Sequence, residues 1–325
     1  MTPELQMFVS ENIRVQDEAL TPISRNIPGA DRYRWKLPEQ VQLRSATTVA
    51  LQRTLNARRK LPPPAMRKLQ IEDTDRVARR YGDMIGYNAA EVFVDLPLLK
   101  QLNRRGALGG RKVTVWLSRF PLKLLHELLD QARLIYPEAS DLGDFRADER
   151  DVDDEWQALV KADCIITPHA FLADRMKQFV DGEKVQQVGW ELPNLSEKRL
   201  TQGRYIFFSG PTSAREGAYA VREAARRPGL PVVAGGRHLE SSDFWQGVKL
   251  LPAASHPLQN ATVVVCHAVM KNRPTPILNA ISNGIPVIVT PECGLDSTIP
   301  TVKFGDADAL IEAIRGLFAD CPTVI

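Results

Sequence analysis

Short apolar runs and longer stretches with helical spacing of apolar residues follow one another along most of this chain. Unbroken apolar runs of four to eight residues are typical of strands buried on both faces, and apolar residues three and four positions apart predict helices. We predict strands at Glu91–Asp95, Lys112–Leu117, Cys164–Thr167, Lys184–Val188, Arg204–Ser209, Pro231–Ala234, Val248–Leu251, Ala261–Cys266, Pro286–Thr290 and Thr301–Phe304. We predict helices at Phe120–Tyr136, Trp156–Ala162, Ala170–Val180, Ser213–Arg227, Thr275–Asn283 and Asp308–Phe318.

The order of these elements predicts the fold class. Strands that alternate with helices indicate a parallel sheet covered by helices on its faces. The pattern runs twice, with a polar break at Leu192–Leu200 between the two runs. We therefore expect an α/β protein with two Rossmann-like domains and a cleft between them. The N-terminal domain would span residues 1–194 and the C-terminal domain residues 195–325.

The first 80 residues are less regular than the rest. Ala46–Arg59 and Glu72–Tyr81 are compatible with helices, whereas the prolines of Leu61–Pro64 are expected to lie outside any regular helix. The sequence predicts no fold for residues 1–80.

Composition and charge narrow the classes of protein that fit. With 44% hydrophobic and 25% charged residues the chain is neither disordered nor collagen-like, and a net charge of +3 gives no global field for nucleic acid. Lys and Arg gather in residues 1–110 and acidic residues in 138–155. Both are explained by solvated surface, and the basic part also by contact with an anionic partner such as a membrane.

The cysteines and the N-terminus predict the compartment. Cys164, Cys266, Cys293 and Cys321 lack the close spacing of a zinc site and fit a reducing cytoplasm. The N-terminus lacks the pattern of a signal peptide, and no apolar run approaches the roughly 20 residues that span a bilayer. We expect a cytoplasmic protein, with membrane association limited to peripheral contact through the basic N-terminal half.

Candidate chemistry lies where predicted strands end, because ligands of open parallel sheets bind outside the carboxyl ends of the strands. After the strand at 204–209, Gly210 allows close approach to a ligand, and Thr212 and Ser213 could cap a helix and donate to phosphate. After the strand at 231–234, Gly235 again permits close approach, and Arg237 could reach a phosphate. Plain glycine turns are the alternative at both places.

The segment after the strand at 261–266 has the strongest signal. Its loop carries Lys271 and Arg273, and the next helix begins near Thr275 with prolines in its first turn. Cations beside the free N–H groups of a helix N-terminus suit a diphosphate. An exposed basic loop that caps the helix is the alternative.

This region resembles the C-terminal domain of retaining GT-B glycosyltransferases of the family-4 type. Leu278–Ile288 (LNAISNGIPVI) is similar to the family pattern LEAMA-x-G-x-PVI, and Gly305–Leu310 (GDADAL) to GD-x-x-AL. Upstream pieces match in order, and the resemblance covers residues 155–318. These pieces are Phe208–Gly210, Arg215–Gly217, Val233–Gly236 and Ala162–His169.

The resemblance implies transfer of a hexose-type sugar from a UDP or GDP sugar to an acceptor, with retention and without a metal or other cofactor. The acceptor would be a glycan, a lipid-linked or a small molecule, and no nucleic acid is expected as partner. The expected donor-binding residues are Gly210, Thr212, Ser213, Arg215, Gly235, Arg237, Lys271, Arg273, Thr275 and Asn279.

The chain departs from the family at several of these positions. The family has two glutamates eight residues apart, where this chain has Lys271 and Asn279. The usual arginine and lysine of the first turn are replaced by Pro211 and Glu216. Cations such as Arg215 could supply the lost charge. The departures leave two alternatives open: a non-catalytic protein that binds a nucleotide sugar or a partner, and a nucleotide-sugar epimerase or hydrolase.

Three residues at strand ends of the N-terminal half are candidates for catalysis. Asp95 follows the strand at 91–95, Arg119 follows that at 112–117, and His169 follows that at 164–167. His169 is a candidate proton carrier, with helix capping as the alternative. Arg119 is a candidate partner for an anionic acceptor or the donor phosphate, with an ordinary ion pair as the alternative.

Overall fold

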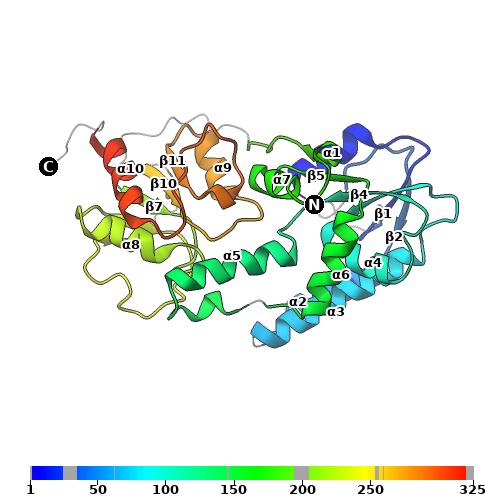
Figure 1. Cartoon of the computed structure of the whole chain (residues 1–325), viewed down its shortest axis with the longest axis horizontal. Coiled ribbons are helices and arrows are strands. Elements are labelled where there is room, and N and C mark those ends of the chain that lie inside the picture. Colours follow the sequence, from blue (N-terminus) through cyan, green and yellow to red (C-terminus); the bar gives the residue numbers. More distant parts are fainter. Residues whose placement is uncertain are drawn as a thin grey trace. The chain divides into compact units, whose positions relative to one another are not determined.

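A computed structural model describes residues 2–24, 35–61, 63–144, 146–193, 205–252, 256–258 and 260–319 (Figure 1). The chain divides into two compact units, each of which gathers separate segments. The first unit holds Met1–Pro121, Glu149–Thr167 and Phe179–Gly189, and the second holds Leu122–Asp148, Pro168–Gln178 and Trp190–Ile325. The predicted domain boundary at residues 194 and 195 lies outside the described residues and stays a prediction.

The first unit is built on two parallel arrangements of strands. β1 pairs with β2, and a second sheet has the strand order β3-β4-β5-β6, parallel throughout. The elements are α1 (Pro3–Asn12), β1 (Glu18–Thr21), β2 (Gln42–Ser45), α2 (Thr47–Ala57), α3 (Pro63–Gly82), β3 (Glu91–Asp95), α4 (Leu96–Arg104), β4 (Lys112–Trp116), α6 (Glu149–Val160), β5 (Cys164–Thr167), η3 (Gly182–Lys184) and β6 (Val185–Gln187). Leu5 and Val9 of α1 pack on Trp116 and Ile166 of the sheet.

The second unit is built on one parallel sheet with the strand order β11-β10-β7-β8-β9. Its elements are α5 (Leu122–Ile135), η2 (Ser140–Leu142), α7 (Ala170–Met176), β7 (Tyr205–Phe208), α8 (Ala218–Arg226), β8 (Val232–Ala234), β9 (Leu250–Leu251), β10 (Ala261–Cys266), α9 (Thr275–Ser282), β11 (Val287–Val289), η4 (Pro291–Cys293) and α10 (Ala307–Ala319). The chain starts at the central strand β7, builds outward to β9, and returns to the other side of β7 with β10. This is a doubly wound order, and its direction reverses between β7 and β10.

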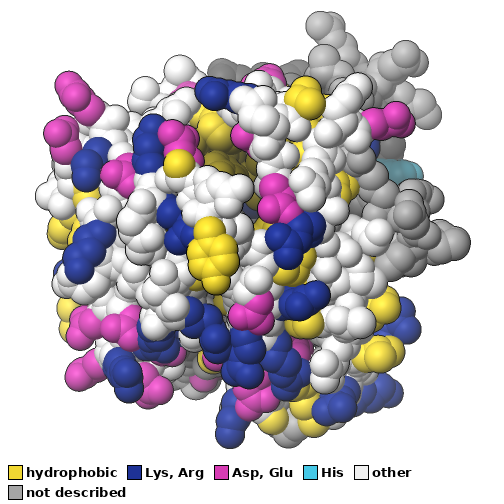
Figure 2. Space-filling model, turned by 90° about the vertical axis from the view of Figure 1, so that its right-hand side faces the viewer, with side chains coloured by type: hydrophobic (Ala, Val, Ile, Leu, Met, Phe, Trp, Pro, Cys, Tyr) yellow, Lys and Arg dark blue, Asp and Glu magenta, His cyan; other side chains and the backbone are white. Residues whose placement is uncertain are grey.

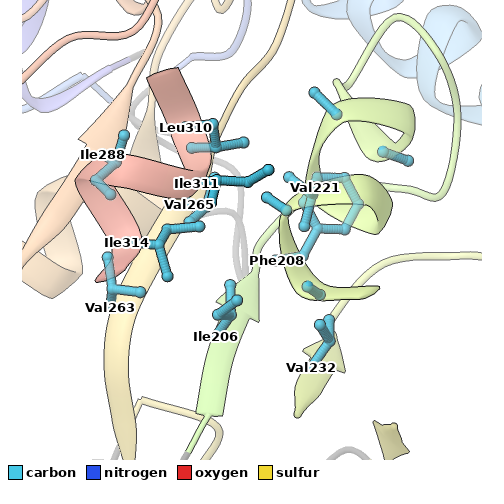
Figure 3. Close-up of a cluster of buried hydrophobic side chains, with 14 of the residues drawn as sticks. Ile206, Phe208, Val221, Val232, Val263, Val265, Ile288, Leu310, Ile311 and Ile314 are labelled. Carbon is cyan, nitrogen blue, oxygen red and sulfur yellow. The ribbon is translucent and has the colours of Figure 1, made fainter. Parts of the chain in front are cut away.

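Helices cover both faces of this sheet. On one face, side chains from α8 and α10 meet those of the strands, and Figure 3 shows them turned toward one another. The labelled members of this core are Ile206, Phe208, Val221, Val232, Val263, Val265, Ile288, Leu310, Ile311 and Ile314. On the other face, Ile277 and Ala280 of α9 pack against Phe207 and Val264. Burial of both faces accounts for the nearly continuous apolar character of these strands.

The expected fold class is confirmed, since both sheets are parallel and alternate with helices. Among the individual elements, Thr301–Phe304 is not a strand: only Thr301 forms a bridge, to Val289. The helix expected from Ser213 begins at Ala218, because residues 213–217 form turns. α3 begins at Pro63, against the expectation for the proline run. Prolines fit a first helical turn because N–H groups there have no partner within the helix.

Candidate functional site

The candidate site of the second unit lies at the carboxyl ends of β7 and β10, where the sheet reverses its winding direction. The two strands are neighbours in register, with Phe208 opposite Val265. Ser209 and Gly210 therefore emerge beside His267, and the chain departs from both ends in loops. Ligands of doubly wound sheets bind at such a point, because two adjacent loops separate there.

Backbone contacts tie the loop after β7 to the loop after β10. The N–H of Val269 donates to the carbonyl of Arg215 at 2.9 Å. Gly217 has φ +83°, and a Cβ at this position would lie 1.8 Å from the carbonyl oxygen of His267. Only glycine fits such a position, which needs both a left-handed backbone and the space of a missing side chain. The two loops are therefore held at a fixed spacing.

The glycine pair after β8 serves the same packing. A Cβ on Gly236 would lie 2.3 Å from the carbonyl oxygen of Gly210, and one on Gly235 would lie 2.7 Å from the ring of Phe207. The close approach predicted for these glycines is thus an approach to neighbouring protein atoms. The side chain of the next residue, Arg237, is exposed to solvent.

Lys271 places a cation at this junction of loops. Its ammonium group forms an ion pair with the carboxylate of Glu216, and the two side chains are 21% and 19% exposed. A Cβ on Gly210 would lie 2.8 Å from Oε2 of Glu216, so this pair sits directly against the first turn. Burial alone would lower the pKa of Lys271, but acidic neighbours, Glu216 among them, raise it. Lys271 is therefore a charged, half-buried lysine.

The backbone of Lys271 is held from both sides. Its N–H donates to the carbonyl of Glu292 at 3.1 Å, and Nε2 of His169 lies 2.9 Å from its carbonyl oxygen. His169 and Glu292, which lie far from Lys271 in the sequence, thus fix the position of its backbone. His169 and Lys271, both predicted as site residues, are brought together in this way.

His169 is buried and uses both ring nitrogens for structure. It is the N-cap residue of α7, and Nδ1 accepts a hydrogen bond from the N–H of Leu172 at 3.3 Å. Nε2 must then carry the proton, which it donates to the carbonyl of Lys271. Burial lowers the pKa of His169 to about 4, so the ring is neutral at pH 7. The geometry fits the helix-capping alternative and gives no support to a proton carrier.

The start of α9 holds the second predicted cation. Nη1 of Arg273 donates to Oγ1 of Thr275 at 2.8 Å, and Nη2 donates to the carbonyl of Glu191 at 3.4 Å. Thr275 is the first residue of α9, and the half-buried Asn279 follows one turn later. The predicted residues Lys271, Arg273, Thr275 and Asn279 thus lie on one loop and the helix that it enters.

Thr212, Ser213 and Arg215 lie in the turn after β7, and neither Thr212 nor Ser213 stands at the start of a helix. Thr212 is fully buried, and its Oγ1 accepts a hydrogen bond from Nε1 of Trp245 at 3.3 Å. Ser213 is also buried and precedes α8 by five residues, so neither residue caps that helix. The N–H of Arg215 donates to Oδ2 of Asp141 at 2.8 Å.

Two polar residues at the strand ends were missed by the sequence analysis. Nε2 of His267 accepts a hydrogen bond from the N–H of Gly305 at 2.9 Å, which leaves the proton on a buried Nδ1 without a partner. Oγ of Ser209 is likewise buried without a partner. Burial lowers the pKa of His267 to about 4. Unpaired buried polar atoms are rare in proteins, and these two lie at the ends of the adjacent strands β7 and β10.

The cysteines Cys266 and Cys293 also meet near this place. Their Sγ atoms are 3.6 Å apart, and both residues are buried. Cys266 lies in an apolar strand and Cys293 in the turn after the next strand, so the sequence gave no signal of their proximity.

The remaining predicted residues, Asp95 and Arg119, belong to the first unit. Burial raises the pKa of Asp95, although Ser118 donates a hydrogen bond to it, and its Oδ1 has no partner. Arg119 forms an ion pair with Glu155, a carboxylate that is itself only 2% exposed. Arg119 thus matches the alternative that was given for it, an ion pair, and the partner in this pair is buried.

Among the described residues, no group of His, Cys, Asp and Glu side chains is placed to hold a metal ion. The helices of the described segments include none long and apolar enough to cross a membrane.

No protein-family model and no curated protein matches the chain in sequence. Solved structures do resemble it over most of its length. Sucrose-phosphate synthase from Thermosynechococcus elongatus has a TM-score of 0.56 and 15% identity, over 93% of this chain and 79% of the other. The apo form of the lipopolysaccharide outer core galactosyltransferase WaaB has a TM-score of 0.50 and 11% identity, over 87% and 76%.

Arabidopsis thaliana UGT89C1, in complex with quercetin, is similar to the same extent. Its TM-score is 0.50 at 12% identity, over 99% of this chain and 88% of the other. At these identities the likeness bears on the fold. It agrees with the two parallel sheets, the doubly wound order and the resemblance of residues 155–318. The chain has the fold of the GT-B glycosyltransferases.

Proposed function

We propose that this protein transfers a sugar from a nucleotide-diphosphate sugar, of the UDP or GDP type, to an acceptor. The observation that carries the proposal is the placement of Lys271. A half-buried lysine stands where the doubly wound sheet reverses, its backbone is held by His169 and Glu292, and unpaired polar atoms of Ser209 and His267 lie nearby. This combination suits a diphosphate, which needs positive charge and hydrogen-bond donors in a shielded place.

In this reaction the bond between the anomeric carbon and the diphosphate oxygen breaks. A bond forms between the anomeric carbon and the acceptor oxygen, and the acceptor loses its proton. Negative charge grows on the leaving diphosphate, and Lys271 would stabilise it together with the N-terminal N–H groups of α9. The resemblance implies that no metal takes part and that configuration is retained.

The other predicted residues have distinct places in the proposal. Arg273 and Thr275 shape the start of α9, and Asn279 would donate or accept a hydrogen bond with a ribose hydroxyl. His169 acts through Lys271 and is a positioning residue. Asp95 stays a candidate base for the acceptor, because its raised pKa brings a carboxyl group closer to the range useful for proton transfer. Arg119 stays a candidate for an anionic acceptor.

One observation favours a second candidate function, binding of a nucleotide sugar without turnover. Glu216 already compensates the charge of Lys271, and Arg273 is already bonded to Thr275 and Glu191. A cation that already has a counterion within the protein attracts a diphosphate less strongly than a cation without one. The absence of the family's two glutamates, at positions 271 and 279, also favours binding without turnover. An epimerase or hydrolase has no such observation in its favour.

The test is incubation with UDP and GDP sugars, with and without glycan, lipid-linked and small-molecule acceptors, followed by measurement of free UDP and GDP. Release that depends on an acceptor is the expected result. Binding in a calorimeter without release would favour the second candidate, and neither binding nor release would overturn both. Arg273→Ala should weaken nucleotide-sugar binding, whereas Arg315→Ala, which removes an exposed arginine from α10, should not.

A further inference from the structure

A basic and apolar surface covers α2 and the start of α3 in the first unit. Residues 40–71 contain seven Lys and Arg and no Asp or Glu. The basic residues are Arg44, Arg53, Arg58, Arg59, Lys60, Arg67 and Lys68. A stretch of this length with a single sign of charge gives a local positive field that the net charge of the whole chain conceals.

Large apolar side chains stand exposed within this basic stretch. Leu51 and Leu55 of α2 are 50% and 64% exposed, and Ile71 of α3 is 47% exposed. Leu51 and Leu55 are four residues apart, so they lie on the same side of the helix. Arg58 follows Leu55 by three residues and Arg59 by four, which places basic residues next to this apolar stripe.

The stripe belongs to a helix that is anchored on its opposite side. Nδ2 of Asn56 donates to Oδ1 of Asp73 at 2.9 Å, and both residues are buried between α2 and α3. Ala50 is buried on the same side. The leucines are therefore exposed by the packing of α2 on α3. The first acidic residues after this stretch are Glu72 and Asp73. Both form ion pairs with Arg76, so they do not neutralise the basic residues of the stretch.

Figure 2 shows Lys and Arg side chains gathered along the lower part of one face, with hydrophobic side chains among them. We define the α2–α3 surface by its exposed residues Leu51, Arg53, Leu55, Arg58, Arg59, Lys60, Lys68 and Ile71.

We propose that the α2–α3 surface docks on the anionic surface of a lipid bilayer. Each lysine or arginine close to such a surface is attracted by the negative potential of the headgroups. The exposed leucines gain by entering the boundary between headgroups and acyl chains, as the apolar face of an interfacial helix does. A nucleic acid would use the basic residues but would leave the leucines in water, so the bilayer accounts for both features. This inference does not rest on the proposed glycosyl transfer.

The experiment is sedimentation of the whole protein with vesicles of phosphatidylcholine, alone or mixed with phosphatidylglycerol. We expect binding to the mixed vesicles, weakened by salt, and little binding to phosphatidylcholine alone. Arg58→Ala, Arg59→Ala and Lys60→Ala together should weaken binding about 100-fold, the equivalent of three basic residues at the surface. Leu51→Ser with Leu55→Ser should weaken it about tenfold.

Matched controls come from the second unit. Arg226→Ala, Arg227→Ala and Arg315→Ala together remove the same charge from exposed sites, and Leu134→Ser with Leu239→Ser remove exposed leucines. These variants should bind vesicles like the parent protein. Thermal unfolding of every variant checks that it folds. Equal binding to both kinds of vesicle, equal losses in the control variants, or binding to RNA and DNA oligonucleotides without binding to vesicles would each overturn the proposal.

Discussion

At the scale of single residues, the two departures from the family pattern that reverse a charge prove to be partners. The family has a lysine where this chain has Glu216 and a glutamate where it has Lys271, and here the two side chains form an ion pair. The exchange thus keeps one cation and one carboxylate at the same junction of loops. Sequence comparison position by position shows two losses, whereas the contact shows a compensated exchange.

This pair gives the first prediction. Lys271→Met leaves Glu216 in a half-buried place without its counterion, and we expect a loss of about 1–2 kcal/mol in the free energy of unfolding. The value is below that of a fully buried pair, because solvent screens side chains that are one-fifth exposed. Affinity for UDP or GDP should fall about tenfold with the lost charge-assisted bond. Urea unfolding and calorimetry measure the two effects.

Reversal of the pair is the matched control. Glu216→Lys combined with Lys271→Glu restores an ion pair and should recover both the stability and the affinity that each single reversal loses. Recovery of stability without recovery of affinity would mean that the cation serves folding and does not bind the diphosphate.

A second prediction concerns His267 and pH. Burial lowers its pKa from 6.5 in the unfolded chain to about 4 in the folded protein. The unfolded chain therefore binds the proton first as pH falls, and the folded state is destabilised progressively between pH 6.5 and 4, by up to about 3 kcal/mol. Nearby, Asp306 favours the charged form and limits the effect.

His267→Gln keeps an acceptor for the N–H of Gly305 but cannot titrate. The difference in free energy of unfolding between parent and variant should thus shrink steadily from pH 7 to pH 4. All other titrating groups are common to both proteins and cancel. A difference that stays constant over this range would contradict the neutral, buried state assigned to His267.

At the scale of elements, glycine turns set the spacing of the loops. Gly217 and Gly229 both have positive φ, but only Gly217 has a neighbour where a Cβ would stand. Replacement by alanine costs about 1–2 kcal/mol at either position for the left-handed backbone alone. Gly217→Ala must in addition move the carbonyl of His267, so we expect it to be less stable than Gly229→Ala by at least about 2 kcal/mol. Thermal unfolding compares the two, and equal losses would mean that the loops can separate without cost.

The elements also show how far the sequence predicts the structure. The strands Glu91–Asp95, Cys164–Thr167 and Ala261–Cys266 have the bounds that were predicted. For Ala261–Cys266 the reason is burial on both faces, which leaves an unbroken apolar run. The start of α8 was misplaced by five residues. Ser213 is a good helix cap by residue type, but the contact of Gly217 with His267 decides where the helix can begin.

Within the site, the sequence predicted the loop that carries Lys271 and Arg273, because its charge and the following helix start are local features. It did not predict the ion pair with Glu216 or the meeting of Cys266 with Cys293, since both depend on loops brought together by the sheet. For Thr212, residue type suggested a phosphate ligand; the sequence did not predict that its hydroxyl group also accepts a hydrogen bond from Nε1 of Trp245.

At the scale of the whole molecule, the two units do not follow the order of the chain. Leu122–Asp148 and Pro168–Gln178 belong to the second unit although segments that follow each of them, Glu149–Thr167 and Phe179–Gly189, belong to the first. Tyr136 contacts Tyr219 with ring centroids 5.1 Å apart, and Asp141 accepts the N–H of Arg215. A single boundary predicted from a polar break carries no information on such returns of the chain, because they depend on tertiary contacts.

This division leads to a prediction for the whole chain. If UDP or GDP binds at the ends of β7 and β10, hydrogen exchange should slow in residues 209–217 and 267–279 when the nucleotide is added. It should slow next in α5 and η2, which the bond between Asp141 and Arg215 couples to the first of these loops. Residues 40–71 should exchange at an unchanged rate, since they belong to the first unit and both loops belong to the second. Mass spectrometry of peptides resolves these segments, and Lys271→Met is the control that should need about ten times more nucleotide for the same protection. Protection confined to the basic residues 40–71 would mean that the nucleotide is bound there as a simple anion, and the site at β7 and β10 would have to be given up.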